Sequence, residues 1–134
     1  GSHFPLGIVR GNGEILVRHP VALEPDDSLL CAGEISTQAV LTVLEGPEAS
    51  LKEAAQHQAS EIQQLGWEAP LLFYCGGRDL HLGREAATRE LQLMKSVVRR
   101  LDGAVSLGEI GAECQGDYPL HYNGALISVH LEAM

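Results

Sequence analysis

The sequence predicts an α/β fold, with α+β as the alternative, in which two long amphipathic helices pack against a mixed β-sheet of five to six strands. Three observations predict it. Two segments of about 18 residues carry apolar side chains at helical spacing. Short runs of aliphatic and β-branched residues lie before, between and after these segments. The order is β-β-β-α-β-α-β-β, and because each helix can act as a crossover, some strand pairs are expected to be parallel.

A β-hairpin is predicted first. The segments 6–10 and 14–18 are rich in Ile, Val and Leu, and Gly11-Asn12-Gly13 between them favours a tight turn. Residues 20–28 contain two prolines and three acidic residues, which indicates a surface connection. The run 38–44 then predicts a third strand.

The first helix is predicted over 48–65, with Gly66 as its C-terminal cap. The continuous apolar run 70–75 follows, which is typical of a central strand covered on both faces. A second amphipathic helix is predicted over 84–101. Strands at 104–108 and 124–131 complete the fold.

The length of 134 residues favours one domain, over 4–134. Gly1-Ser2-His3 is typical of the remnant of a cleaved affinity tag, so the natural chain is expected to extend further at its N-terminus. A net charge of −9 disfavours nucleic acid as a partner. No apolar run has the length of a membrane span.

The cysteines indicate a reducing compartment. Cys31, Cys75 and Cys114 are an odd number of widely spaced thiols, which favours a cytoplasmic protein over a disulfide framework. No C-x-x-C or H-x-x-x-H spacing occurs, so no metal site is predicted.

The candidate binding segment is Cys75-Gly76-Gly77-Arg78, at the carboxyl end of the central strand, where open α/β sheets commonly bind ligands. Glycines allow a close approach to backbone N–H groups, and Arg78 can clamp a carboxylate or phosphate. The alternative is a tight turn in which a carboxylate or carbonyl oxygens satisfy Arg78. The segment does not match the P-loop or dinucleotide fingerprints.

A second candidate, Glu109, lies between glycines at the end of the next predicted strand. If the two strands are neighbours, Glu109 and Arg78 converge at one edge and suit a ligand with an amine and a carboxylate, as an amino acid has. The alternative is an ion pair between Glu109 and Arg78 that holds two loops together. His121 precedes the last strand and is expected to line the same edge, or else to form an ordinary polar turn.

Cys75 is also a candidate nucleophile, with His81 or His121 as base. No Cys-His protease signature surrounds it, and a free cysteine is commonly a small buried apolar residue. The protein is therefore not expected to be an enzyme.

Several motifs are familiar in this order. They are Pro5-Leu6-Gly7-Ile8, Val17-Arg18, Tyr74-Cys75-Gly76-Gly77-Arg78, Leu82-Gly83, Gly108-Glu109-Ile110-Gly111 and His121-Tyr122-Asn123. Together they resemble the C-terminal half of FIST proteins, a sensory module of bacterial signalling proteins and of some eukaryotic F-box proteins. The resemblance implies ligand sensing without turnover, with amino acids as proposed ligands. It also implies an N-terminal FIST half and a downstream signalling protein as partners.

The leading hypothesis is a signal-transduction domain that binds a small polar ligand, without a cofactor, through Cys75, Gly76, Gly77, Arg78, Glu109 and His121. The main alternative is a protein–protein interaction or scaffold module without a ligand. Some family members resemble haem-based gas sensors, a lesser alternative that needs an axial ligand such as His81 or His121. A Cys75-dependent enzyme is the remaining alternative.

Overall fold

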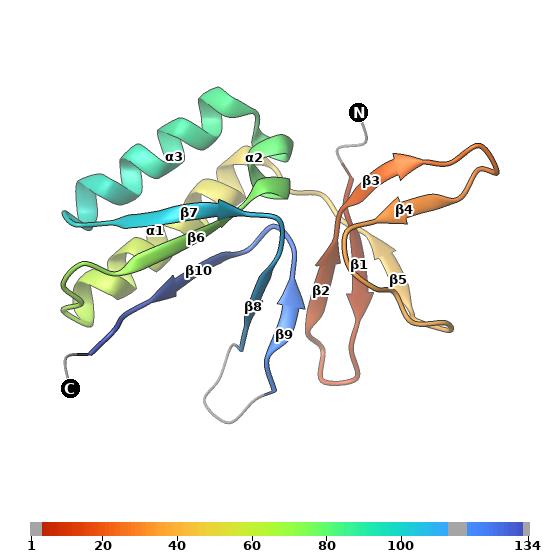
Figure 1. The fold of residues 1–134 in the computed structure, drawn as a ribbon, viewed down its shortest axis with the longest axis horizontal. Coiled ribbons are helices and arrows are strands. Elements are labelled where there is room, and N and C mark those ends of the chain that lie inside the picture. The colour runs from red at the N-terminus through yellow and green to blue at the C-terminus, as the bar shows by residue number, and fades with distance from the viewer. Residues whose placement is uncertain (1–3, 113–117, 133–134) are drawn as a thin grey trace.

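The computed structural model describes residues 4–112 and 118–132 (Figure 1). The predicted tag remnant, residues 1–3, and Cys114 lie outside the described residues. Three helices and ten short strands in these ranges form an α+β fold, which confirms the predicted class. The helices are α1 (Glu48–Gln64), α2 (Gly76–Leu82) and α3 (Arg84–Val97). The strands are β1 (Leu6–Val9), β2 (Ile15–Arg18), β3 (Pro20–Leu23), β4 (Leu29–Cys31), β5 (Leu41–Val43), β6 (Leu71–Cys75), β7 (Asp102–Ser106), β8 (Glu109–Gly111), β9 (Leu120–Tyr122) and β10 (Leu126–Val129).

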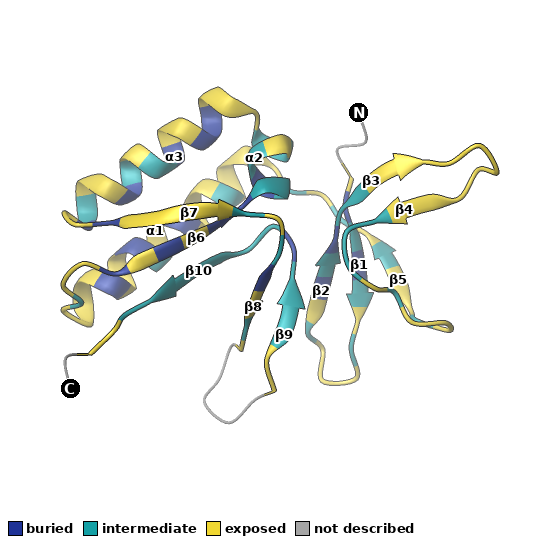
Figure 2. Ribbon diagram, viewed as in Figure 1, coloured by how far each residue is buried: buried dark blue, intermediate teal, exposed yellow. Residues whose placement is uncertain are grey.

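The main sheet has β6 at its centre. β10 pairs with β6 antiparallel, and β7 pairs with it in parallel, with Cys75 opposite Ser106. A parallel pair was expected from a helical crossover between the two strands, and α2 and α3 form that connection. Helices α1 and α3 cover one face of this sheet and enclose the core (Figures 1 and 2). The core consists of Ala55, Ala59, Ile62, Leu72, Tyr74, Ala87, Met94, Val98 and Leu101.

The predicted coverage of β6 on both faces is wrong. Leu72 and Tyr74 face the helices and are 4% and 2% exposed, whereas Leu71 and Phe73 are 36% and 37% exposed on the other face. Because both long helices lie on one side, the apolar run of β6 leaves alternate side chains uncovered (Figure 2). The open face carries the candidate site described below.

The prediction of a single sheet of five to six strands is also wrong. In the described ranges the strands form two sheets of three strands, β2-β1-β5 and β10-β6-β7, and two hairpins, β3-β4 and β8-β9. The first hairpin, β1-β2, forms as predicted. Residues 20–28, predicted as a surface connection, contribute β3, and their acidic part forms the turn to β4. Strands β8 and β9 were not predicted, because each has only three residues and is too short to show an alternating pattern.

The helix boundaries follow local chemistry. Helix α1 has nearly its predicted length, and Gly66 follows it with a φ of 68°, as expected of a residue after a helix. The second predicted helix ends at Val97 because Val98 has extended backbone, and β7 begins two residues earlier than expected. The short helix α2 was not predicted, since it starts at two glycines, which have low helix propensity.

Gly103 sets how closely β6 and β7 pack. A Cβ at this position would overlap the carbonyl oxygen of Leu72. We predict that Gly103→Ala lowers the free energy of unfolding by about 1–3 kcal/mol, because the strand pair must open to admit the methyl group. Urea unfolding measures this change. Gly11→Ala is the control, since nothing lies within 4 Å of a Cβ there, and equal stabilities for the two variants would contradict the prediction.

Candidate functional site

Parallel pairing brings the two predicted glycine-rich segments together. Cys75 lies beside Ser106, and α2 starts directly after Cys75, while the turn to β8 follows Ser106. Two cavities flank the turn between β7 and β8. The larger, of about 760 Å³, is lined by His19, Pro20, Val21, Ala32, Cys75, Gly76, Gly77, Leu80, His81, Leu107 and Asn123. The smaller, of about 260 Å³, is lined by Phe73, Ser106, Gly108, Glu109, Ile110 and Ile127.

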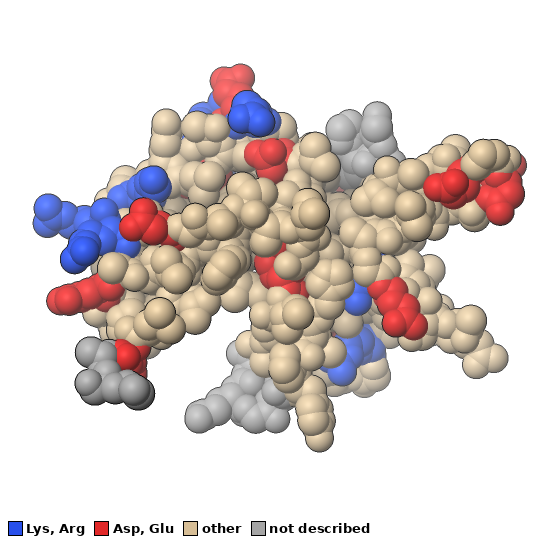
Figure 3. Space-filling view, in the orientation of Figure 1, with Lys and Arg blue, Asp and Glu red and all other residues tan. Residues whose placement is uncertain are grey.

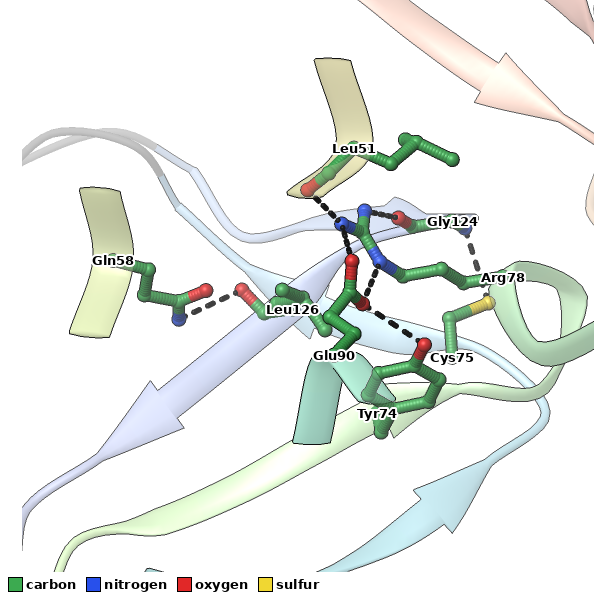
Figure 4. Close-up of polar contacts among 8 residues, drawn as sticks. All are labelled: Leu51, Gln58, Tyr74, Cys75, Arg78, Glu90, Gly124 and Leu126. Atoms are coloured by element: carbon green, nitrogen blue, oxygen red, sulfur yellow. Dashed lines mark hydrogen bonds and ion pairs between the residues drawn. The ribbon is translucent and has the colours of Figure 1, made fainter. Parts of the chain in front are cut away.

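Arg78 lies within the helix layer and is 5% exposed. Its Nε and Nη2 donate to Glu90 Oε1 and Oε2 at 2.8 and 3.0 Å (Figure 4). Nη2 also donates to the Leu51 carbonyl at 2.7 Å, and Nη1 donates to the Gly124 carbonyl at 3.2 Å. Four of the five guanidinium N–H donors are thereby used inside the protein. This arrangement agrees with the alternative prediction for Arg78, in which a carboxylate and carbonyl oxygens satisfy its side chain.

Glu90 completes this buried network, and sequence reasoning missed it. It is 4% exposed, and Tyr74 Oη donates to its Oε1 at 2.9 Å. Burial, with the Glu90 carboxylate adding to it, raises the pKa of Tyr74, so the phenol stays protonated as a donor. Glu90 stands three residues after Ala87 and four before Met94, so its helical spacing places it on the buried face of α3. That spacing was the signal that could have found it.

Cys75 is 1% exposed, and the Gly124 N–H donates to its Sγ at 3.0 Å. Burial raises the pKa of the thiol, and the Glu109 carboxylate raises it further, which outweighs the backbone N–H groups that lower it. A buried thiol with a raised pKa is a poor nucleophile. The site therefore gives no support to Cys75-dependent catalysis.

Glu109 lies on the open side of the main sheet, in the smaller cavity. It is 3% exposed, and its Oε1 accepts a hydrogen bond from Ser106 Oγ at 2.6 Å. Its Oε2 is buried and has no hydrogen-bond partner in the described part of the chain. Within residues 4–112 and 118–132, no ion pair joins Glu109 to Arg78, so the loop-joining pair does not form.

A FIST C domain model matches residues 1–112, which include both glycine-rich segments. The chain belongs to the FIST C domain family. FIST domains are sensory domains of signalling proteins, rather than catalytic domains. Searches of curated proteins and of solved structures gave no significant match. No helix that could cross a membrane occurs in the described ranges of this FIST C domain.

His121 lies in β9, and Asn123 belongs to the turn that follows this strand. The His121 ring lies against Gly33 and Gly108, where a Cβ would overlap it, and it lines neither of the two cavities. Asn123 lines the larger cavity, and its Oδ1 accepts the backbone N–H of His19 at 3.2 Å. The sequence analysis named Asn123 only as the last residue of the motif His121-Tyr122-Asn123.

His19 is another residue of the cavity wall that the sequence did not single out. Its ring lies against Gly77, where a Cβ would approach it to 2.7 Å. The pKa of His19 is lowered, first by burial and then by the nearby His81 imidazole. No sequence signal marks His19, because the backbone bond to Asn123 that places it spans 104 residues.

The two histidines named as candidate axial haem ligands both have contacts within the protein. His81 Nε2 lies 2.7 Å from the Gly46 carbonyl oxygen, and the His121 ring packs against Gly33 and Gly108. In the described part of this FIST C domain, no three His, Cys, Asp or Glu side chains come together to hold a metal ion.

The buried ion pair gives a stability prediction. Arg78→Ala leaves Glu90 charged and unpaired, so the free energy of unfolding should fall by about 3–5 kcal/mol in urea titrations. The double variant Arg78→Met, Glu90→Leu should recover most of this loss, because no buried charge remains. Arg89→Ala is the control: its ion pairs with Glu48 and Glu85 are exposed, and we expect a loss below about 1 kcal/mol. A loss at Arg78 as small as at Arg89 would contradict the assignment.

His19 gives a pH prediction. Because its pKa is lower in the folded than in the unfolded chain, the unfolded chain takes up the proton first as the pH falls. The domain therefore loses stability as the pH drops below about 6.5, and His19 has no such effect at higher pH. His19→Gln should flatten the decrease of the unfolding free energy between about pH 7 and pH 5. His57→Gln, which removes a histidine from an exposed helix surface, is the matched control, and equal slopes in all three proteins would refute the prediction.

Proposed function

We propose that this FIST C domain senses a small polar ligand that carries a protonated amine, such as an amino acid, and that Glu109 receives the amine. The proposal rests on one observation. Glu109 is 3% exposed, yet its Oε2 has no hydrogen-bond partner among the described residues. A buried carboxylate without a partner is costly, and an ammonium group supplies three donors and the opposite charge.

The surroundings of Glu109 favour a small amine over a larger cation. The cavity has a volume of about 260 Å³, and its walls include Phe73, Ile110 and Ile127. Apolar walls lower the local dielectric constant and so strengthen the attraction between a carboxylate and an ammonium ion. Ser106 holds Oε1 by a hydrogen bond, which restrains the carboxylate, and Oε2 remains available for a donor of the ligand.

Ligand occupancy has a route toward the helix layer. The Cys75 thiol lies close enough to Glu109 for the carboxylate to raise its pKa, and Cys75 Sγ accepts the Gly124 N–H. The Gly124 carbonyl in turn accepts a hydrogen bond from Arg78, which is paired with Glu90 on α3. A ligand that favours one arrangement of this turn would shift the population of the helix layer, and Arg78 acts here as a positioning residue.

Membership of the FIST C domain family also suggests the partners of the sensor. An N-terminal FIST half and a downstream signalling protein would receive the signal. The β3-β4 hairpin offers a surface for such a contact, because its strands expose large apolar side chains (Figure 2). These are Val21, Leu23, Leu29 and Leu30. Cys31 and Cys75 are free thiols, which supports a reducing compartment such as the cytoplasm.

The test is a thermal-shift screen with the twenty amino acids and with methylamine. We expect at least one amine ligand to stabilise the wild type by about 2.7 kcal/mol at one hundred times its Kd. Glu109→Gln should weaken that ligand at least about thirtyfold, since it removes a buried charge partner. The same variant should unfold no more readily than the wild type without ligand, because the unpartnered charge is gone.

Glu61→Gln, on the exposed side of α1, is the control and should bind as the wild type does. Equal binding by wild type and Glu109→Gln would refute the role of Glu109. A screen without any amine ligand, together with a stable ligand-independent protein complex, would favour the scaffold function instead.

A further inference from the structure

The two edges of the main sheet differ in the side-chain hydrogen bonds that they receive. On the β10 edge, Gln58 of α1 donates from Nε2 to the Leu126 carbonyl at 3.1 Å and to Ser128 Oγ at 2.7 Å. On the β7 edge, no side chain in residues 4–112 and 118–132 makes a hydrogen bond to the β7 backbone. The outer N–H and C=O groups of β7 are therefore open to another strand.

The sequence of β7 lacks the usual protection of an edge strand. It contains no proline, and its one charged residue, Asp102, stands at its first position. Residues 102–105 are exposed, and Val105 is 64% exposed. An extended peptide that pairs with such an edge gains main-chain hydrogen bonds, and its side chains need a neighbouring pocket for specificity.

A pocket of this kind lies beside β7. A cavity of about 250 Å³ between β7 and α3 has Leu91, Leu101 and Val105 among its apolar walls, with Lys95 at its side. It shares no lining residue with the Glu109 cavity. Its volume and walls suit one large aliphatic or aromatic side chain.

Unpaired basic residues lie near the C-terminal end of α3, and one of them, Lys95, lines this pocket. Lys95, Arg99 and Arg100 are exposed and have no ion pair in the described part of the chain. They are three of the nine basic residues in a chain of net charge −9. Figure 3 shows basic side chains gathered at the end of α3. This local charge attracts acidic groups and opposes the charge of the whole molecule.

We propose that the β7 edge is a docking site for an extended acidic segment of a partner protein. The segment pairs with β7 as an added strand, places an apolar side chain in the 250 Å³ cavity and sets acidic side chains against Lys95, Arg99 and Arg100. A second copy of the chain is a poorer occupant, because two copies of net charge −9 repel each other. This surface is separate from the amine site and does not rest on the proposed function.

The test selects binders from a displayed library of random eight-residue peptides. Enriched peptides should alternate apolar and polar positions and carry at least two acidic residues. Their affinity should fall about tenfold for the variant Lys95→Glu, Arg99→Glu, Arg100→Glu, which reverses three exposed charges. Lys52→Glu, an exposed basic residue of α1, is the matched control and should bind as the wild type does.

Hydrogen exchange then locates the bound peptide. We expect it to slow exchange of β7 amides, and a proline at its centre should abolish this protection. The proposal is overturned if no acidic peptide is enriched, if the triple variant binds normally or if β7 amides stay unprotected. Protection of β7 in the free protein at raised concentration would also overturn it, because the occupant would then be a second copy.

Discussion

The ion pair between Arg78 and Glu90 fixes the relation between the helices and the main sheet. Arg78 belongs to α2, Glu90 to α3, and the same guanidinium reaches the Leu51 carbonyl of α1 and the Gly124 carbonyl before β10 (Figure 4). Both charged groups are buried, so each depends on the other for the solvation that water no longer provides. A shift of any one of these elements would leave a buried charge without a partner.

The turn that contains Gly124 extends this constraint to the rest of the chain. Its N–H bonds to Cys75 Sγ, and the preceding Asn123 accepts the His19 N–H. Arg18 donates to the His121 carbonyl at 3.0 Å. The N-terminal strands, the end of β6 and the helix layer therefore meet at one turn. The amine site that we propose lies next to this junction, since Glu109 is a neighbour of Cys75.

The sequence predicted features that depend on local patterns. The hairpin around Gly11-Asn12-Gly13, the helix α1 and the strand β6 each follow from turn chemistry or from periodicity within a few residues. The site was harder to predict from the sequence, because burial decides the roles of its charged residues. Arg78 was expected beside Glu109, and the distant partner Glu90 holds it within the helix layer instead. The placement of His19 depends on a contact across 104 residues, which no local pattern contains.

The most direct test of the central claim observes the Glu109 carboxylate itself. Carbon-13 NMR of the glutamate side-chain carboxyl groups, with Glu109→Gln for assignment, follows each carboxylate while methylammonium chloride is added. We predict a saturable shift of the Glu109 signal and an unchanged Glu90 signal, with sodium chloride at equal ionic strength causing no such shift. A Glu109 signal that responds equally to both salts, or to neither, would contradict the account.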